Sequence, residues 1–284
     1  MSATADQRRQ ALGYWEANAA PWDTTIGPGG NNYWKRLQKP CLERLLADHF
    51  QAKDRPHRAL ELACGNGLCS RWLASHSDAV GEVLATDGSR AMLDRARSHG
   101  SMDGKISFRE LDVTNVDDFT RLLEEGAGIP KADFDIIIMN MALMDVCDLE
   151  PVASALPKLL SKDGVFVATL LHPVFMTSNY TRDIQYAFDS ATGEERLVRS
   201  KAIHEYLDVA PAKQFALAGR SAPCMSFHRP IHELLAPFFK AGLVMDAMEE
   251  PSFDGEDADP ERPQATTNFT QLPAHLAFRL RRLA

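Results

Sequence analysis

Short apolar segments alternate with amphipathic stretches through the middle of the chain. The apolar segments cover residues 59–62, 82–86, 105–110, 134–139 and 165–171. They predict β-strands, because they are short and rich in apolar side chains, many of them β-branched. The stretches between them cover residues 68–75, 90–99, 116–125 and 149–160. Their apolar positions recur at helical spacing, which predicts amphipathic helices. The alternation therefore indicates a parallel sheet with helices on both faces.

The same pattern continues towards the end of the chain. Residues 231–241 predict a helix that ends at Gly242, and residues 243–248 and 276–280 predict two further strands. The expected fold is thus a doubly wound, Rossmann-like α/β fold of seven strands. In such a fold the carboxyl ends of the parallel strands share one edge, and ligands bind there. Functional residues are therefore expected where the strands end.

Two segments lie outside this repeat. Residues 1–55 contain three of the four tryptophans, Trp15, Trp22 and Trp34, and are expected to form a helical cap over the site. Residues 172–228 separate the fifth strand from the next helix by more than a simple connection needs, which predicts a lid. Residues 56–284 would then be one domain that contains this lid as an insertion.

Composition and charge narrow the class of protein. With 45% hydrophobic and 25% charged residues, the chain is typical of a soluble globular protein. Its net charge of −8 argues against a nucleic-acid partner, which needs clustered basic residues. The five cysteines form no C-x-x-C pair, so no metal site is expected. We expect a cytoplasmic protein without a membrane partner, since no segment resembles a secretory signal or a membrane span. A monomer and a homodimer both stay open.

The strongest motif is the sequence LELACGNG at residues 60–67, which joins the first strand to a helix. Its small residues allow a ligand to approach the backbone, and the helix start supplies free N–H donors. Asp87 ends the second strand 20 residues after Gly67, a spacing suited to a carboxylate that binds ribose hydroxyls. Asp112 ends the third strand, and Val113 follows it at a position suited to an adenine edge. Singly, each feature could be only a tight turn or a helix cap. Together they predict a nucleotide-like ligand.

In these residues the chain resembles the class I S-adenosylmethionine-dependent methyltransferases of the small-molecule, natural-product type. The resemblance covers about residues 57–171 and the closing strands, and it implies that the last strand is antiparallel. It also implies S-adenosylmethionine as the cofactor. The residues it implies for binding this donor are Trp22, Glu61, Ala63, Gly65, Gly67, Asp87, Asp112, Val113, Asn140 and Met141.

By this resemblance, Glu61 would orient the loop, and Ala63, Gly65 and Gly67 would pass under the methionine part. Asp87 would bind the ribose and Asp112 the adenine amino group. Asn140 and Met141 follow the fourth strand, where the family contacts the methionine part.

One position departs from the family pattern. Many members have glycine where this chain has Ala63. We expect binding to survive, provided that the backbone angle there tolerates a Cβ atom. A dinucleotide is the rival ligand, because residues 65–70 are close to G-x-G-x-x-G. Ser70 in the third small position and the acidic end of the first strand count against it. An NAD(P)-dependent oxidoreductase and a non-catalytic nucleotide-binding module are therefore kept as alternatives.

The residues that would bind the methyl acceptor are less clearly indicated by the sequence. Methyl transfer is an in-line displacement that depends mainly on alignment, and a base is needed only when the acceptor is protonated. His172 at the end of the fifth strand and His228 in the lid are the candidate bases. A structural role for His172, bonding loop backbone, is the competing interpretation. Trp22 could stack near the sulfonium or cover the acceptor.

Aromatic and sulfur-containing side chains are frequent in the lid, which suggests a small, mainly apolar acceptor. Those considered are Phe175, Met176, Tyr180, Tyr186, Tyr206, Phe215, Met225 and Phe227. The predicted substrate contacts in the lid and at its edge are Phe175, Tyr180, Phe227 and Arg229. The general pattern is similar to natural-product O-, N- and S-methyltransferases, including thiol methyltransferases. Nothing in the sequence selects among oxygen, nitrogen and sulfur as the methylated atom.

Overall fold

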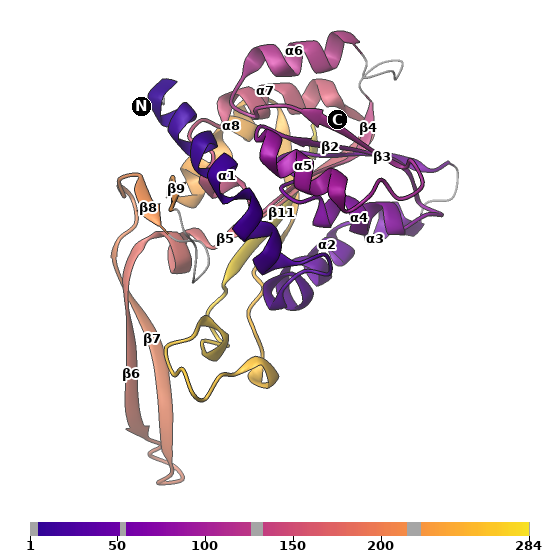
Figure 1. The fold of residues 1–284 in the computed structure, drawn as a ribbon. Helices are drawn as coiled ribbons and strands as arrows, with labels where there is room; N and C mark the ends of the chain where they lie inside the picture. The colour runs from indigo at the N-terminus through magenta and orange to yellow at the C-terminus, as the bar shows by residue number, and fades with distance from the viewer. Residues whose placement is uncertain (1–4, 52–54, 126–132, 215–222, 284) are drawn as a thin grey trace.

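A seven-stranded sheet forms the centre of the molecule (Figure 1). The computed structural model describes residues 5–51, 55–125, 133–214 and 223–283. The strand order is β10-β11-β5-β4-β1-β2-β3. The strands are β1 (His57–Glu61), β2 (Val80–Asp87), β3 (Ile106–Glu110), β4 (Phe134–Asn140), β5 (Leu160–Leu171), β10 (Leu243–Glu249) and β11 (His275–Arg282). The first five are parallel, whereas β11 is antiparallel to β5 and β10. The predicted fold class is confirmed, including the antiparallel last strand.

The five helices predicted beside the strands are present, and their ends lie within one residue of the sequence predictions. They are α4 (Leu68–Ser75), α5 (Arg90–Ser98), α6 (Val116–Glu125), α7 (Glu150–Leu159) and α8 (Ile231–Lys240). Helix α5 illustrates why the helix positions could be predicted from the sequence. Its start is capped by the Ser89 hydroxyl, which accepts a hydrogen bond of 3.1 Å from the backbone N–H of Met92. Its buried face consists of Met92, Leu93 and Ala96.

The core lies in two layers, one on each face of the sheet. Neighbouring residues on a strand belong to different layers, because strand side chains alternate between the two faces. On β1, Leu60 belongs to the layer that contains Phe166 and Phe278, whereas Ala59 belongs to the layer that contains Val167. This alternation confirms that helices cover both faces. It also fixes which side chains at the strand ends can reach the ligand edge.

An N-terminal helical segment precedes the sheet, as the sequence predicts. It comprises α1 (Ala5–Ile26), the π-helical turn η1 (Trp34–Gln38), α2 (Lys39–Leu45) and α3 (Ala47–Gln51). The long indigo helix α1 lies beside α5 (Figure 1). The Glu16 carboxylate accepts a hydrogen bond of 2.5 Å from the Ser89 hydroxyl, and Arg8 forms an ion pair with Asp148 at 2.7 Å. A boundary at residue 55 between cap and domain stays a prediction.

The segment after β5 contains a long hairpin that the sequence reading did not predict. The turn η4 (Pro173–Thr177) leads into β6 (Asn179–Phe188) and β7 (Glu195–Glu205), which extend away from the main sheet (Figure 1). Two short strands, β8 (Ala212–Gln214) and β9 (Cys224–Ser226), follow before α8. Phe215, one of the aromatic residues considered for the lid, lies outside the described residues.

The turns η3 (Leu143–Asp145), η5 (Gly255–Asp257) and η6 (Thr266–Asn268) complete the described elements. No helix in the described part of the chain combines the length and the apolar character that a membrane span requires.

Candidate active site

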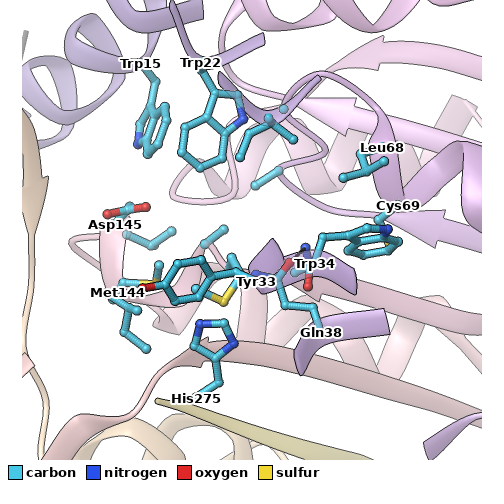
Figure 2. A pocket seen from close by; sticks show the side chains of 18 of the residues that line it. Trp15, Trp22, Tyr33, Trp34, Gln38, Leu68, Cys69, Met144, Asp145 and His275 are labelled. Carbon is cyan, nitrogen blue, oxygen red and sulfur yellow. Dashed lines mark hydrogen bonds between the residues drawn. The ribbon is translucent and has the colours of Figure 1, made fainter. Parts of the chain in front are cut away.

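A cavity of about 960 Å³ lies at the carboxyl edge of the sheet. Side chains at the ends of four strands contribute to its wall, among them Glu61, Asp87, Asn140 and Leu171. Helix α1, the turn η1 and residues 262–267 supply other parts of the wall. This volume is near the upper end of the range for small-molecule sites. In Figure 2, Trp15 and Trp22 face Tyr33 and Met144 across the cavity.

The loop between β1 and α4 has an unusual backbone. Gly65 and Gly67 have φ of +55° and +73°, in the left-handed region that glycine adopts without strain. Ala63 also lies in this region, with φ of +54°. Alanine adopts this region only at a cost, so the condition placed on Ala63 is met with some strain, and the survival of donor binding there stays a prediction. An alanine is held in a glycine-like conformation at a wall of the cavity, which is where backbone strain tends to be stored.

Two buried carboxyl groups support this loop. Asp87 accepts hydrogen bonds of 2.8 Å from the backbone N–H groups of Gly65 and Ser89, one on each carboxylate oxygen. Glu61 accepts a hydrogen bond from the Ser70 hydroxyl. Burial raises the pKa of Asp87 to about 6 and that of Glu61 to about 8. Both carboxyl groups at this cavity therefore ionise at a higher pH than usual. A bound cation or hydroxyl donor would stabilise their charged forms.

Asp112 and Val113 line the cavity beyond the end of β3. One oxygen of Asp112 accepts hydrogen bonds from the Thr114 backbone N–H at 2.8 Å and from its hydroxyl at 2.7 Å. The backbone N–H of Asp112 donates to Asp118 at 2.8 Å. These contacts fix the carboxylate on the same side of the cavity edge as Asp87, and Val113 adds a buried apolar surface next to it.

Asn140 and Met141 lie at the end of β4. The Asn140 side chain accepts a hydrogen bond of 2.6 Å from the Thr169 hydroxyl and donates one of 3.2 Å to Gln38. The backbone N–H of Met141 donates to the Thr169 carbonyl at 2.8 Å, and Met141 has a positive φ of +56°. The ends of β1 and β4 therefore each place a non-glycine residue in the left-handed region at the cavity wall.

Helix α1 covers the loop after β1. The Trp22 ring meets Trp15 edge to face at 5.2 Å between ring centres, and a Cβ atom on Gly65 would lie 3.6 Å from the Trp22 indole nitrogen. Asp23 accepts a hydrogen bond of 3.0 Å from the Asn66 side chain and contacts His99 Nε2 at 2.6 Å. Burial disfavours the ionised form of Asp23, but these two hydrogen bonds outweigh it and lower the pKa of the carboxyl.

Nine of the ten predicted donor contacts line this one cavity. The exception is Gly67, which packs against α5, since a Cβ atom on Gly67 would lie 3.1 Å from Ala96 Cβ. Its glycine is needed for the turn and for close helix packing.

Of the predicted substrate contacts, only Tyr180 lines the cavity. Phe175 packs against the His172 ring at 4.9 Å, and Phe227 is buried in a separate small cluster with Ala11. Arg229 donates to the Val146 carbonyl at 2.8 Å and so supports the loop after β4. These placements give Phe175, Phe227 and Arg229 supporting positions behind the wall, and a direct substrate contact for them stays a prediction.

Both candidate bases are engaged in structural hydrogen bonds. Nδ1 of the buried His172 accepts a bond of 3.2 Å from the Val174 backbone N–H, so Nε2 carries the proton that faces Glu250 at 2.8 Å. His228 bonds the Thr177 hydroxyl at 2.8 Å and the Tyr206 carbonyl at 2.6 Å. Burial lowers the pKa of both imidazoles. Neither residue belongs to the cavity wall, which favours the structural interpretation, and a catalytic role for either stays a prediction.

His275 is a cavity residue that the sequence reading missed. It lies at the start of β11, is only 1% exposed, and stacks on Tyr33 at 5.7 Å between ring centres (Figure 2). Neither of its ring nitrogens has a hydrogen-bond partner among the described residues, and the same holds for the Thr267 hydroxyl in the cavity wall. Burial lowers the pKa of His275 to about 3, which keeps the imidazole neutral. Its position in an apolar strand gave no sequence signal of a site.

Comparisons with known proteins agree with this geometry. Residues 60–166 match a family model described as a methyltransferase domain. A search of curated protein sequences gave no match. An S-adenosylmethionine-dependent methyltransferase from Mesorhizobium loti has a TM-score of 0.60 and 23% identity, with 90% of this chain and 100% of that chain covered. The CcbJ methyltransferase from Streptomyces caelestis has a TM-score of 0.54 and 16% identity, with coverages of 95% and 98%.

A third solved structure is the glycopeptide N-methyltransferase MtfA in complex with S-adenosylmethionine. It has a TM-score of 0.50 and 10% identity, and the match covers 85% of this chain and 93% of that chain. The chain thus contains a methyltransferase domain and has the class I fold of the S-adenosylmethionine-dependent methyltransferases. S-adenosylmethionine is the methyl donor named for structures of this fold, such as those from Mesorhizobium loti and MtfA, and it is therefore the ligand to compare with the cavity.

The cavity residues fit this donor. Buried Asp87 offers a carboxylate for hydroxyl groups, and the left-handed loop at Gly65 allows close approach of a ligand to the backbone. Apolar Met92 and Val113 line the cavity near Asp112, as an adenine ring would require.

Proposed function

We propose that the protein is an S-adenosylmethionine-dependent methyltransferase that acts on a small, mainly apolar acceptor, which binds in the same cavity as the donor. The observation that carries the proposal is the continuity of the cavity. One space of about 960 Å³ extends from Asp87 at the end of β2 to Tyr180 in the hairpin. Many of its lining side chains are apolar, among them Ile26, Met144 and Leu171, which suits an apolar acceptor. A bulky polymer would not fit in such a space.

The donor half of the site follows from the strand ends. We assign the ribose hydroxyls to the Asp87 carboxylate, the adenine amino group to Asp112, and the methionine part to the loop of residues 63–67 and to Asn140. The sulfonium donor supplies an activated methyl group when bound. Trp22 and Trp15 exclude water from above, and this exclusion strengthens the interaction between the buried carboxylates and a positive charge.

The acceptor half lies on the side of β5 and β11. His275 of β11 pairs with Leu171 of β5. On the other side of β5, Asn140 of β4 pairs with Thr169, two residues before Leu171. A neutral imidazole without a hydrogen-bond partner could accept a bond from an acceptor hydroxyl or amine. The methylated atom is left open between oxygen, nitrogen and sulfur.

A mass-spectrometric screen tests the proposal. Purified protein and S-adenosylmethionine are incubated with panels of small phenols, amines, thiols and carboxylic acids. We expect at least one panel to gain the mass of a methylene group, because a methyl group replaces a proton. Asp87→Ala should reduce the gain when S-adenosylmethionine is below saturation, because donor binding is weakened, and the exposed Asp94→Ala in α5 is the matched control. Tight binding of NAD(P)H without binding of S-adenosylhomocysteine would contradict the proposal in favour of an oxidoreductase.

A further inference from the structure

Two cations face each other at the base of the hairpin. Arg182 of β6 and Lys201 of β7 are directly opposite in the antiparallel register, so their side chains lie on the same face. Like charges in this arrangement destabilise a hairpin. Arg182 lines the cavity, and Lys201 contacts the cavity residue Met176, with Nζ 3.2 Å from its sulfur. The pair therefore adds positive charge to a largely apolar wall.

Neither cation is neutralised by a carboxylate within the described part of the chain. Arg182 donates to the Gln264 carbonyl at 2.6 Å and to the Tyr180 hydroxyl at 3.3 Å. Lys201 donates to the Phe175 carbonyl at 2.6 Å. All these partners are uncharged. A guanidinium has five N–H donors in a planar fork, so Arg182 keeps donors for a ligand.

The contrast with Arg262 is informative. Arg262 lines the same cavity, but its charge is balanced by Asp259 at 2.7 Å. Arg8, the third arginine of this wall, is likewise paired, with Asp148 at 2.7 Å. Among the arginines that line the described cavity, Arg182 is therefore the one whose charge is left for an incoming anion.

Aromatic rings hold the two cations in place. Lys201 Nζ lies 4.5 Å from the centre of the Tyr180 ring and 5.7 Å from that of Phe269. The Arg182 guanidinium lies 5.9 Å and 5.8 Å from the same two ring centres. Burial, with a contribution from Arg182, lowers the pKa of Lys201 to about 8. Lys201 is partly buried beside the exposed Arg182, so the charge of Lys201 carries a desolvation cost that a bound anion would offset.

We propose that Arg182 and Lys201 form an anion subsite that binds a carboxylate group of the methyl acceptor. The inference rests on the proposed function and names its substrate class, an apolar acceptor with a carboxylate at one end. The planar fork of Arg182 matches a planar carboxylate, and Lys201 adds a second positive charge behind it. Tyr180, which lines the cavity, then provides apolar surface next to the bound group. The carboxylate orients the acceptor and takes no part in the transfer itself.

Small probes test the subsite without knowledge of the natural acceptor. The dissociation constants of benzoate and of its uncharged analogue benzamide are measured by NMR titration, with the protein saturated with S-adenosylhomocysteine. We expect benzoate to bind at least about tenfold more tightly than benzamide. Arg182→Met and Lys201→Met should each weaken benzoate about tenfold or more and leave benzamide unchanged.

Arg196→Met is the matched control. Arg196 is an exposed residue of β7 whose register places it on the opposite face of the hairpin, so its loss should not affect benzoate. Equal affinities for benzoate and benzamide, or an equal effect of Arg196→Met, would overturn the subsite. Phenyl phosphate binding more than tenfold more tightly than benzoate would overturn the carboxylate assignment.

Two further measurements separate the inferences. The affinity of each variant for S-adenosylhomocysteine reports whether the donor half is intact. Titration of benzoate is repeated without S-adenosylhomocysteine. A loss of donor binding with retained benzoate selectivity would count against the proposed function alone, whereas the reverse result would count against the subsite alone.

Discussion

Asp23 in α1 and Asn66 in the loop after β1 are joined by a hydrogen bond of 3.0 Å between the carboxylate oxygen and the side-chain amide. The same oxygen of Asp23 contacts His99 Nε2 at 2.6 Å. One carboxylate thus ties the N-terminal helix both to the donor loop and to the end of α5. The helical cap is held over the cavity by these contacts together with those of Glu16.

Removal of this tie should loosen the cap. In Asp23→Ala we expect faster amide hydrogen exchange in the second half of α1 and a donor affinity about tenfold lower. Exchange is measured by mass spectrometry and affinity by calorimetry with S-adenosylhomocysteine. Asp6→Ala, which removes an exposed carboxylate in the first turn of α1, is the control and should change neither. Unchanged exchange in Asp23→Ala would show that the helix is held by other contacts.

The strain at Ala63 gives a second prediction. Because its φ of +54° suits glycine better than alanine, Ala63→Gly should raise the free energy of unfolding by about 1 kcal/mol. Urea unfolding of the two proteins measures the difference. Ala91→Gly in α5 should have the opposite sign and cost about 1 kcal/mol, since its backbone is helical. A destabilised Ala63→Gly would mean that the left-handed backbone of this loop is not strained.

Much of the fold was predictable, because each strand and helix of the sheet repeats a local pattern. The ends of α4 and α6 were predicted to the residue, and donor contacts such as Asp87 were found from their places at strand ends. The hairpin of β6 and β7 was not predicted. In β7, Arg199 and Lys201 share a face with apolar residues, so this strand lacks the clean alternation of a half-buried strand. In β6 the large apolar residues from Tyr180 to Phe188 fall on one face, so an alternating signal was present in that half of the hairpin.

The acceptor half of the site was predictable only in part. His172 has a conspicuous place at the end of β5, but the structure uses it to cap the turn η4. His275 enters the site because β11 is antiparallel, so that the start of this strand, and not its end, meets the ligand edge. That role depends on strand direction and on a contact with Tyr33, far away in the chain. Neither is visible in a local pattern.

Glu61 predicts a pH dependence of stability. Its pKa is raised from 4.5 to about 8 by burial, so the folded protein holds this proton more tightly than the unfolded chain. The resulting stability is complete below about pH 4.5 and is lost as the pH rises through 8. The glutamine of Glu61→Gln does not titrate, so the stability of this variant lacks that pH dependence. Between pH 5 and pH 9 the wild type should therefore lose on the order of 3 kcal/mol more than Glu61→Gln.

Urea unfolding at the two pH values measures this difference, with the exposed Glu124→Gln as control. The control should follow the wild type. If Glu61→Gln showed the same pH dependence as the wild type, Glu61 would be ionised in the folded protein at neutral pH.

Replacement of His275 should stabilise the fold and remove an imidazole from the cavity wall. Its two ring nitrogens have no partner within the described residues, so His275→Phe should raise the free energy of unfolding by about 1 to 2 kcal/mol at pH 7. This gain in the free energy of unfolding should grow below pH 6.5. The unfolded histidine binds a proton there, whereas the folded one, with a pKa of about 3, stays neutral. His76→Phe is the contrast, since His76 bonds the Trp72 carbonyl at 2.9 Å and should lose about 1 kcal/mol. A destabilised His275→Phe would indicate that the imidazole has a partner such as ordered water.

The central claim is that S-adenosylmethionine binds at the strand ends around Asp87, and calorimetry with S-adenosylhomocysteine tests it most directly. Wild type, Asp87→Ala and the exposed Asp94→Ala are titrated under the same conditions. We expect wild type and Asp94→Ala to bind equally and Asp87→Ala to bind more weakly by about 1.5 to 3 kcal/mol, because charge-assisted hydrogen bonds to the ribose are lost. Equal affinity of all three proteins would contradict the account.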